Sequence, residues 1–307
     1  MLEPGTVLGG RYRIEAMIGR GGMAEVYRAY QPTLSRHVAV KIMRGASEQD
    51  ALRFEQEAVS LGRLSHRCAV VAHDHGSFED PKGRTRPFIV MELLTGETLR
   101  QRLDRAGRLP PDVARHVARE IGECIAAAHD VGVIHRDLKP TNIMLVDAPR
   151  RALPEVRVLD FGIAKIFAPN RVSLSAEGEL VGSPRYMAPE QFEDTKIDHR
   201  VDIWTFGLVL HEMLVGGHPL PPRAPFKEVL AWMKGETLPK QGDVPPDLQR
   251  VIERCTARQP EERPHSMDAV LDLLGHPSQG HGRRGIAIGV GLLVLVSLLV
   301  GWMLTLD

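Results

Sequence analysis

The chain has 307 residues, of which 43% are hydrophobic and 25% charged, as expected for an ordinary globular protein with one or two domains. Its 39 basic residues balance 39 acidic ones, so we expect no nucleic acid as a partner, because such partners select an excess of Lys and Arg. The three scattered cysteines, Cys68, Cys124 and Cys255, argue against a disulfide framework or a zinc site and fit a reducing cytosol.

The first distinctive stretch is "GRGGMAEV", which runs from Gly19 to Val26. Glycines that follow a strand can hold phosphate or can form a plain tight turn. A Rossmann turn would lead directly into a helix, whereas here the sequence continues as strands with a turn near Gln31-Pro32. The sequence has no G-x-x-x-x-G-K-[ST] run, which excludes the standard P-loop. A glycine turn between antiparallel strands, with Lys41 on a third strand, instead predicts backbone amides over a triphosphate and a lysine that reaches its phosphates.

Further along the chain the predicted elements change from strands to helices. Residues 11–91 are predicted to be mostly strands, with one helix over 47–64. After about Thr98 the sequence predicts mainly helices, with short strands in "NIMLV" and "VRVLD". The most regular helical stretches are 112–132 and 201–216. A small β-rich part joined to a larger α-rich part favours a ligand cleft between the two.

Motifs in the second part of the chain carry a family resemblance. They are, in order, "VIHRDLKPTN", "LDFG", "GSPRYMAPE", "VDIW" and a late Arg-Pro pair at Arg263. Together with the glycine turn and "VAVK", this order resembles the protein kinases over about residues 11–274. "RFEQEA" and "MAPEQ" are similar to the bacterial serine/threonine kinases of the eukaryotic (Hanks) type. The resemblance implies an α+β fold, the two-lobed protein kinase fold, with a β-rich N-lobe over about 11–94 and a larger α-helical C-lobe over about 95–274.

The resemblance implies a role for individual residues in phosphoryl transfer from ATP. The implied catalytic residues are Lys41, Glu57, Asp137 and Lys139. Asp137 would act as the base for the attacking hydroxyl, Lys139 would neutralise the γ-phosphate, and Glu57 would orient Lys41 toward the α- and β-phosphates. Asn142 and Asp160 are the implied ligands of two Mg²⁺ ions, because both offer hard oxygen donors.

The implied ATP-binding residues come from the glycine turn, the strands beside it and the segment that joins the lobes. They are Ile18, Gly19, Gly21, Val26, Ala39, Lys41, Met91, Glu92, Leu94 and Met144. Ala24 stands where the family has a third glycine. His135 is expected to pack under Phe161 as a core residue, and the resemblance also implies an ion pair between Glu190 and Arg263.

The loop between "DFG" and "APE" contains two candidate phosphosites, Ser173 and Ser175. In the family, the arginine that precedes the catalytic Asp, here Arg136, pairs with a phosphorylated residue of this loop. The alternative is that both serines are ordinary loop residues.

The C-terminal stretch 286–306 is 21 residues long and has no charged residue, so as a helix it would span roughly the 30 Å of a bilayer core. Arg283 and Arg284 precede it in a linker over 275–285, and by the positive-inside rule they predict a single-pass inner or plasma membrane protein with a cytoplasmic kinase domain. Small residues recur along the stretch at multiples of four, which raises the hypothesis of a homodimer through the transmembrane helix. These residues are Gly285, Gly289, Ser297 and Gly301.

Three functions remain open from the sequence. The first is a membrane-anchored kinase that transfers the γ-phosphoryl group of ATP to Ser or Thr of protein substrates, itself included. The second is a membrane-anchored pseudokinase scaffold, against which the intact Lys41, Asp137, Asn142 and Asp160 argue. The third is a small-molecule kinase of similar fold, against which "GSPRYMAPE" argues.

Overall fold

The computed structural model describes residues 2–21, 24–44, 62, 64–81, 83–146, 152–161, 184–192, 197–221, 225–235 and 243–275. The chain divides into a compact unit, Met1–Leu274, and a second unit, Gly275–Asp307, of which only Gly275 is described. Across the described ranges, no helix is both long and apolar enough to cross a bilayer. The predicted span over 286–306 lies outside them, as does almost all of the helix expected over 47–64.

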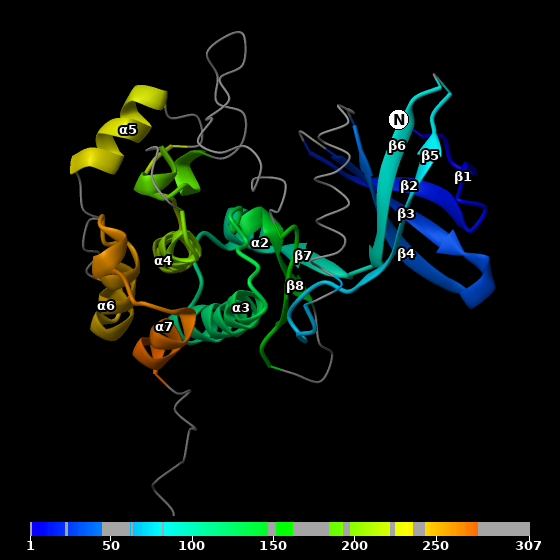
Figure 1. Ribbon diagram of the computed structural model, residues 1–307. Coiled ribbons are helices and arrows are strands. Elements are labelled where there is room, and N and C mark those ends of the chain that lie inside the picture. The colour runs from blue at the N-terminus through cyan, green and yellow to red at the C-terminus, as the bar shows by residue number, and fades with distance from the viewer. Residues whose placement is uncertain are drawn as a thin grey trace, which may run out of the picture. The chain divides into compact units, whose positions relative to one another are not determined.

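Six antiparallel strands form the larger sheet of the first unit, in the order β1-β2-β3-β4-β6-β5 (Figure 1). Their bounds are β1 Val7–Leu8, β2 Tyr12–Arg20, β3 Ala24–Gln31, β4 Arg36–Met43, β5 Ala72–Glu79 and β6 Thr85–Glu92. The turn expected near Gln31-Pro32 is confirmed, because a short 3₁₀ helix at Pro32–Leu34 joins β3 to β4.

The two faces of this sheet pack into different cores. Along β4, Val38, Val40 and Ile42 belong to a core confined to the sheet and the N-terminal residues. Ala39 and Met43, whose side chains point to the opposite face, belong to the larger core shared with the helices. The alternation places Lys41 on the face that looks toward the rest of the unit.

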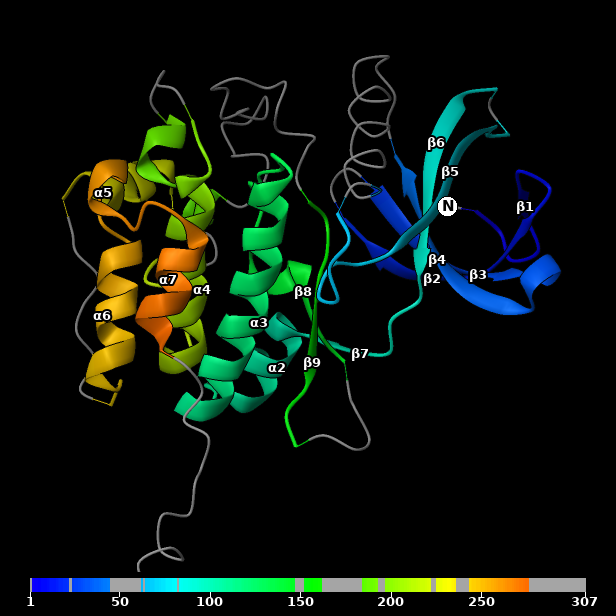
Figure 2. The same cartoon turned by 60° about the horizontal axis from the view of Figure 1, so that its bottom comes forward.

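The helices form the other part of the unit, and Figure 2 shows α3, α4, α6 and α7 running alongside one another. Their bounds are α2 Leu99–Ala106, α3 Pro111–Asp130, α4 Arg200–Val215, α5 Phe226–Gly235, α6 Pro246–Cys255 and α7 Met267–Leu274. Every residue of α4 from Val201 to Leu214 is buried, so this helix is the centre of the helical part. The helices predicted over 112–132 and 201–216 are confirmed, as α3 and α4.

A small sheet of three strands, β7 Gly96–Thr98, β8 Ile143–Val146 and β9 Glu155–Val158, packs against α3. The strands predicted in "NIMLV" and "VRVLD" are confirmed, although β9 ends before Leu159 and Asp160. At Gly96 the chain adopts a φ of +148°, and a Cβ there would lie 2.2 Å from the carbonyl oxygen of Leu145. Only glycine therefore fits at the start of β7.

Residues 67–70, shortly before β5, bond to β9 and α3 of the larger part. The N–H of Val158 donates to the carbonyl of Cys68 at 2.6 Å, and the N–H of Val70 donates to the carbonyl of Val158 at 3.2 Å. Beside them, the Arg67 guanidinium donates two hydrogen bonds of 2.6 Å to the Glu120 carboxylate on α3. Residues 67–70 are thus fastened to β9 and α3.

Candidate active site

A lysine of the large sheet meets an aspartate that follows the small sheet. Lys41, in the middle of β4, places its Nζ 3.0 Å from Oδ1 of Asp160, two residues beyond the end of β9. The lysine side chain is 12% exposed and that of Asp160 is 44% exposed, so the pair lies at the edge of a buried region with the carboxylate open to solvent. Asp160 has a φ of 53°, an uncommon backbone conformation for a residue with a side chain and one found often at functional sites.

Two predicted site residues, Lys139 and Asn142, converge on the carboxylate of a third, Asp137. Lys139 donates from Nζ to Oδ2 at 2.7 Å. Asn142 donates from Nδ2 both to Oδ2 at 3.1 Å and to the backbone carbonyl of Asp137 at 2.9 Å. Because two oxygens fix the Nδ2 side of the amide, Oδ1 of Asn142 is turned to the opposite side, where it can act as a hard oxygen ligand.

His135 is a core residue, as predicted. It is fully buried, and its ring lies 4.7 Å from that of Phe161. Nδ1 accepts from the N–H of Asp137 at 3.2 Å, so the ring proton is on Nε2, which donates to the carbonyl of Leu159 at 3.0 Å. Burial lowers the pKa of His135, in agreement with a neutral ring. This imidazole therefore links the backbone of the two aspartate-bearing loops.

A buried aspartate on α4 bonds to the backbone just before Asp137. The Asp202 carboxylate accepts 2.8 Å hydrogen bonds from the N–H groups of His135 and Arg136 and from Nε2 of His129. Burial opposes ionisation of Asp202, but the hydrogen bond and charge of His129 outweigh it and hold the pKa of this carboxyl below its usual value. The sequence interpretation used "VDIW" only as a motif and missed this role. An acid inside an otherwise apolar helix was the available signal, since a buried charge needs partners.

Several residues assigned to the adenine share one face of the large sheet. In the strand register Val26 lies opposite Lys41, and Ala39 lies opposite Met91. Directly opposed residues of antiparallel strands point to the same face. Val26, Ala39, Met91 and Leu94 all pack into the core shared with the helices.

The remaining adenine assignments lie around this face. Ile18 is 51% exposed on β2, and Met144 lies on β8, opposite Thr98. Glu92 ends β6, where its N–H donates to the carbonyl of Val71 at 3.0 Å and its carboxylate accepts from the N–H of Val71 at 2.9 Å.

Gly19 lies near the end of β2 and Gly21 directly follows that strand, where β2 and β3 form a hairpin. The N–H of Gly21 donates to the carbonyl of Ala24 at 2.9 Å, so this amide closes the hairpin and does not point at a ligand. Neither Gly19 nor Gly21 has a positive φ, and an added Cβ would make only ordinary contacts, 3.6 Å to Val26 and 3.7 Å to Ala24. Contacts inside the protein do not explain glycine at these positions, whereas the close approach of a ligand to the backbone would.

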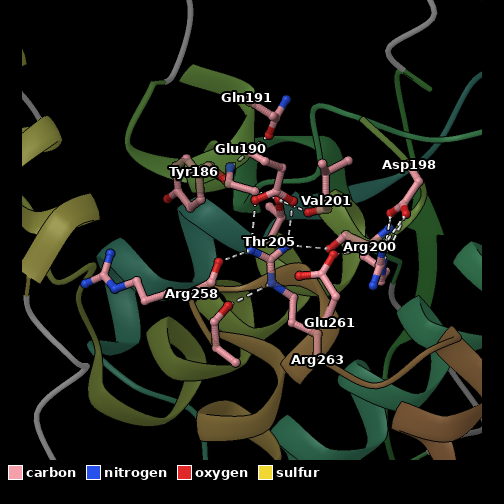
Figure 3. Close-up of polar contacts among 12 residues, drawn as sticks. Tyr186, Glu190, Gln191, Asp198, Arg200, Val201, Thr205, Arg258, Glu261 and Arg263 are labelled. Carbon is pink, nitrogen blue, oxygen red and sulfur yellow. Dashed lines mark hydrogen bonds and ion pairs between the residues drawn. The ribbon is translucent and has the colours of Figure 1, made fainter. Parts of the chain in front are cut away.

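The ion pair expected between Glu190 and Arg263 is confirmed (Figure 3). The two groups form a bidentate pair with distances of 2.6 and 2.8 Å, and the arginine side chain is fully buried. The other three N–H groups of Arg263 donate to the carbonyls of Ala257, Arg200 and Arg258. All five donors are satisfied, so this pair fixes the end of "GSPRYMAPE" against the start of α4.

A second buried acid of α4 contacts the same motif. Glu212 accepts from the hydroxyl of Tyr186 at 2.7 Å and from Arg100 of α2 at 3.0 Å. The sequence interpretation did not single out Glu212, which carries the same signal as Asp202. Glu57 and the candidate phosphosites Ser173 and Ser175 lie outside the described residues.

Comparison with known proteins agrees with this geometry. The protein kinase domain family matches residues 12–276, and the chain therefore belongs to this family. The chain is 35% identical over 278 residues to a probable serine/threonine-protein kinase of Clostridium acetobutylicum, covering 89% of this chain and 40% of that protein. It is 35% identical to the serine/threonine-protein kinase pkn3 of Myxococcus xanthus and 34% identical to PknB of Mycobacterium tuberculosis, covering 86% and 83% of this chain.

The chain spans less than half the length of these relatives, namely 49% of pkn3 and 41% of PknB. Among solved structures, the crystal structure of the Mycobacterium tuberculosis PknI kinase domain matches 89% of this chain and 98% of that domain, with a TM-score of 0.69 at 24% identity. That likeness establishes the fold. The interpretation of the motifs as those of a protein kinase and the predicted two-lobed fold are both confirmed.

Proposed function

We propose that this chain is a serine/threonine protein kinase that transfers the γ-phosphoryl group of ATP to hydroxyls of protein substrates. The observation that carries the proposal is the convergence of Lys139 and Asn142 on the carboxylate of Asp137, together with the contact between Lys41 of the large sheet and Asp160. Phosphoryl transfer depends on positioning and on neutralising charge, and this group supplies one candidate base, two ammonium groups and two hard oxygen ligands. The names of the relatives support the choice of Ser and Thr over small-molecule acceptors.

Each side chain has a role that its contacts support. Asp137 accepts the proton of the attacking hydroxyl, and Lys139 holds this carboxylate and offers charge toward the γ-phosphate. Lys41 binds the α- and β-phosphates, with Glu57 as its orienting partner. Val26, Ala39, Met91 and Leu94 line the adenine, together with the remaining residues proposed from the sequence.

Mg²⁺ fits the residues present. Asn142 turns its carbonyl oxygen away from Asp137, and Asp160 is partly exposed beside Lys41, so hard oxygens are available from two directions. When bound, Mg²⁺ would neutralise phosphate charge. Asn142 and Asp160 would hold it.

The membrane and regulatory parts of the proposal come from the sequence. We place the kinase domain over 11–274, the linker over 275–285 and a single transmembrane helix over 286–306, with the kinase domain in the cytoplasm. After autophosphorylation, the phosphate on Ser173 or Ser175 would pair with Arg136. The small residues of the span would bring two chains together in the membrane.

The test uses the purified 307-residue chain in detergent with labelled ATP, Mg²⁺ and a generic protein substrate. Asp137→Asn keeps the shape of the side chain but removes the base, and we expect transfer to fall by about 10²- to 10⁴-fold. Asp112→Asn, at an exposed position in the first turn of α3, is the matched control and should retain activity. Phosphoamino acid analysis should recover the label on Ser and Thr.

Other outcomes distinguish the alternatives. ATP binding without transfer by the wild-type chain would support the pseudokinase scaffold. Label confined to a small-molecule acceptor would support the third function. Equal transfer by Asp137→Asn and wild type would contradict the role of Asp137.

A further inference from the structure

A buried carboxylate lies directly behind the glycine hairpin and plays no part in the chemistry proposed above. Glu25, the second residue of β3, is 4% exposed and lies opposite Arg20 and Ile42 in the strand register. An acid buried in a sheet needs compensation, since an uncompensated one would be driven to its neutral form. The contacts of Glu25 show how this carboxylate is held.

Three arginines from three strands or their ends surround Glu25. Arg20 and Arg44 approach Oε1 at 3.8 and 3.7 Å, and Arg86 approaches Oε2 at 3.8 Å. Arg86 is itself buried and donates from Nε to the carbonyl of Met43 at 2.7 Å. Burial opposes ionisation, but the Tyr27 hydrogen bond and the positive charges of the N-terminus, Arg86 and Arg20 lower the pKa of Glu25, so it is a carboxylate at neutral pH.

One of these arginines connects the carboxylate to the hairpin. Arg44 follows β4, and while its Nε faces Glu25, its Nη1 donates to the carbonyl of Gly21 at 3.2 Å. Gly21 is also the residue whose N–H closes the hairpin on Ala24. Both backbone polar groups of Gly21 are thus bonded, one within the hairpin and one to a side chain aimed by Glu25.

The N-terminal residues hold Glu25 from the other side. The hydroxyl of Tyr27 donates to Oε2 of Glu25 at 2.8 Å and accepts from the N–H of Leu2 at 2.9 Å. Tyr27 and Leu2 are buried in the core confined to the sheet and the N-terminal residues. On the core side, the carboxylate is therefore held by the buried Tyr27. On the other side, its negative charge holds Arg44, which bonds to the exposed hairpin.

We propose that Glu25 is a positioning residue for nucleotide binding: acting through Arg44, it fixes the carbonyl of Gly21 and so sets the position of the hairpin over the phosphates of the nucleotide. The proposal rests on the proposed function for the identity of that ligand. A hairpin held in place contacts the phosphates equally in the ground state and in the transition state. Glu25 should therefore affect nucleotide affinity more than the rate of the chemical step.

The main variant is Glu25→Gln, which keeps the size of the side chain and its ability to accept from Tyr27 but removes the charge. We expect the KM for ATP and the Kd for ADP, measured by calorimetry on the full chain, to rise by about three- to tenfold, with kcat changed by less than about twofold. Amide hydrogen exchange at Gly21 should become faster, because its N–H lies in the loosened hairpin.

Three further variants separate positioning from a loss of general stability. Arg44→Met should raise the KM to a similar extent, and the double variant should add little to either single one, because both act through one contact. The matched control is Glu15→Gln, which removes a 2.8 Å ion pair with Arg28 on the same sheet, away from the hairpin. Its KM and Gly21 exchange should match wild type, at a temperature where every variant is folded.

The outcomes are distinct. Unchanged nucleotide affinity and unchanged Gly21 exchange in Glu25→Gln overturn the proposal, even if its melting temperature falls. Additive effects of Glu25→Gln and Arg44→Met overturn the route through Arg44. A wild-type chain that binds no nucleotide and transfers no phosphate contradicts the proposed function instead, and Gly21 exchange then still decides whether Glu25 restrains the hairpin.

Discussion

The carboxylate of Asp202 accepts a 2.8 Å hydrogen bond from the backbone N–H of Arg136, which has a φ of 60°. A left-handed conformation costs about 1–2 kcal/mol for a residue with a side chain, so the protein has to hold Arg136 in it. Asp202 does this from a helix that is buried along almost its whole length. The residue that follows Arg136 is Asp137, and the position of the proposed base therefore depends on a carboxylate that does not touch it.

Asp202→Asn should lower both stability and phosphoryl transfer. The asparagine side chain has only one oxygen that can accept, and its NH₂ group would face a backbone N–H that is itself a donor. The free energy of unfolding should therefore fall by about 2–4 kcal/mol. Phosphoryl transfer should be measured at a temperature where the variant is still folded. Its rate should fall by more than the decrease in the fraction of folded protein explains. Asp198→Asn, which removes a partly exposed pair with Arg200, serves as the control and should change stability by less than about 1 kcal/mol. Equal effects of the two variants would contradict a special role for Asp202.

Arg263→Met should be among the most destabilising single changes in the helical part. It removes the bidentate partner of the buried Glu190 carboxylate, at a cost of about 3–5 kcal/mol. Arg263→Lys should recover only part of this loss, because an ammonium group has three donors where the guanidinium uses five. Denaturant unfolding at pH 7 measures both. Full recovery by lysine would show that charge alone, rather than the bidentate geometry, holds "GSPRYMAPE" in place.

Gly96→Ala should prevent normal folding of the small sheet. The added Cβ would overlap the carbonyl of Leu145, and the φ of +148° is closed to alanine, so we expect a loss of at least about 3 kcal/mol. Gly83→Ala is a suitable comparison, because Gly83 also has a positive φ but has open space around it. That variant should lose only about 1 kcal/mol. Similar melting temperatures for the two alanine variants would refute the steric argument.

Acid should destabilise the protein partly through His218. Burial, with help from the Arg185 charge, lowers the pKa of His218 from 6.5 to about 3. Below about pH 6.5 this histidine is protonated in the unfolded chain but stays neutral in the folded protein. The free energy of unfolding therefore decreases as the pH falls from that value toward 3. Between pH 7 and pH 5 the contribution of this residue is about 2 kcal/mol.

The variant that tests this is His218→Asn, whose side-chain oxygen can still accept from the N–H of Leu220 as Nδ1 does at 3.0 Å. The loss of unfolding free energy between pH 7 and pH 5 should be smaller in the variant by that amount, whatever its absolute stability. His265→Asn, which changes an exposed histidine, serves as the control. An unaltered slope in His218→Asn would show that other histidines account for it.

The fold, and contacts between residues of one motif or of two motifs, were predictable from the sequence. The order of the motifs predicted the kinase fold, and the resemblance predicted the His135–Phe161 contact and the Glu190–Arg263 pair. The strand that leads to Asp160 was predicted too, but β9 stops at Val158, because the chain must leave the sheet to give Asp160 its positive φ.

Contacts that involve a residue outside the motifs were not predictable. Glu25, Arg44 and Arg86 come from three separate strands or their ends, and nothing in their spacing along the chain indicates that they meet. The same holds for Arg67 and Glu120, which are 53 positions apart. Such contacts depend on the register between strands and on helix packing, which a single sequence does not encode as a local pattern. Asp202 and Glu212 are intermediate cases, since their burial could be inferred but their partners could not.

The hydrogen bonds of Cys68 and Val70 to β9 give the two lobes a second attachment besides the covalent connection at residues 93–95. A body joined to another at one point can swivel in any direction, whereas two separated points leave a single easy rotation about the line between them. Relative motion of the two lobes would then be mainly a rotation about that line.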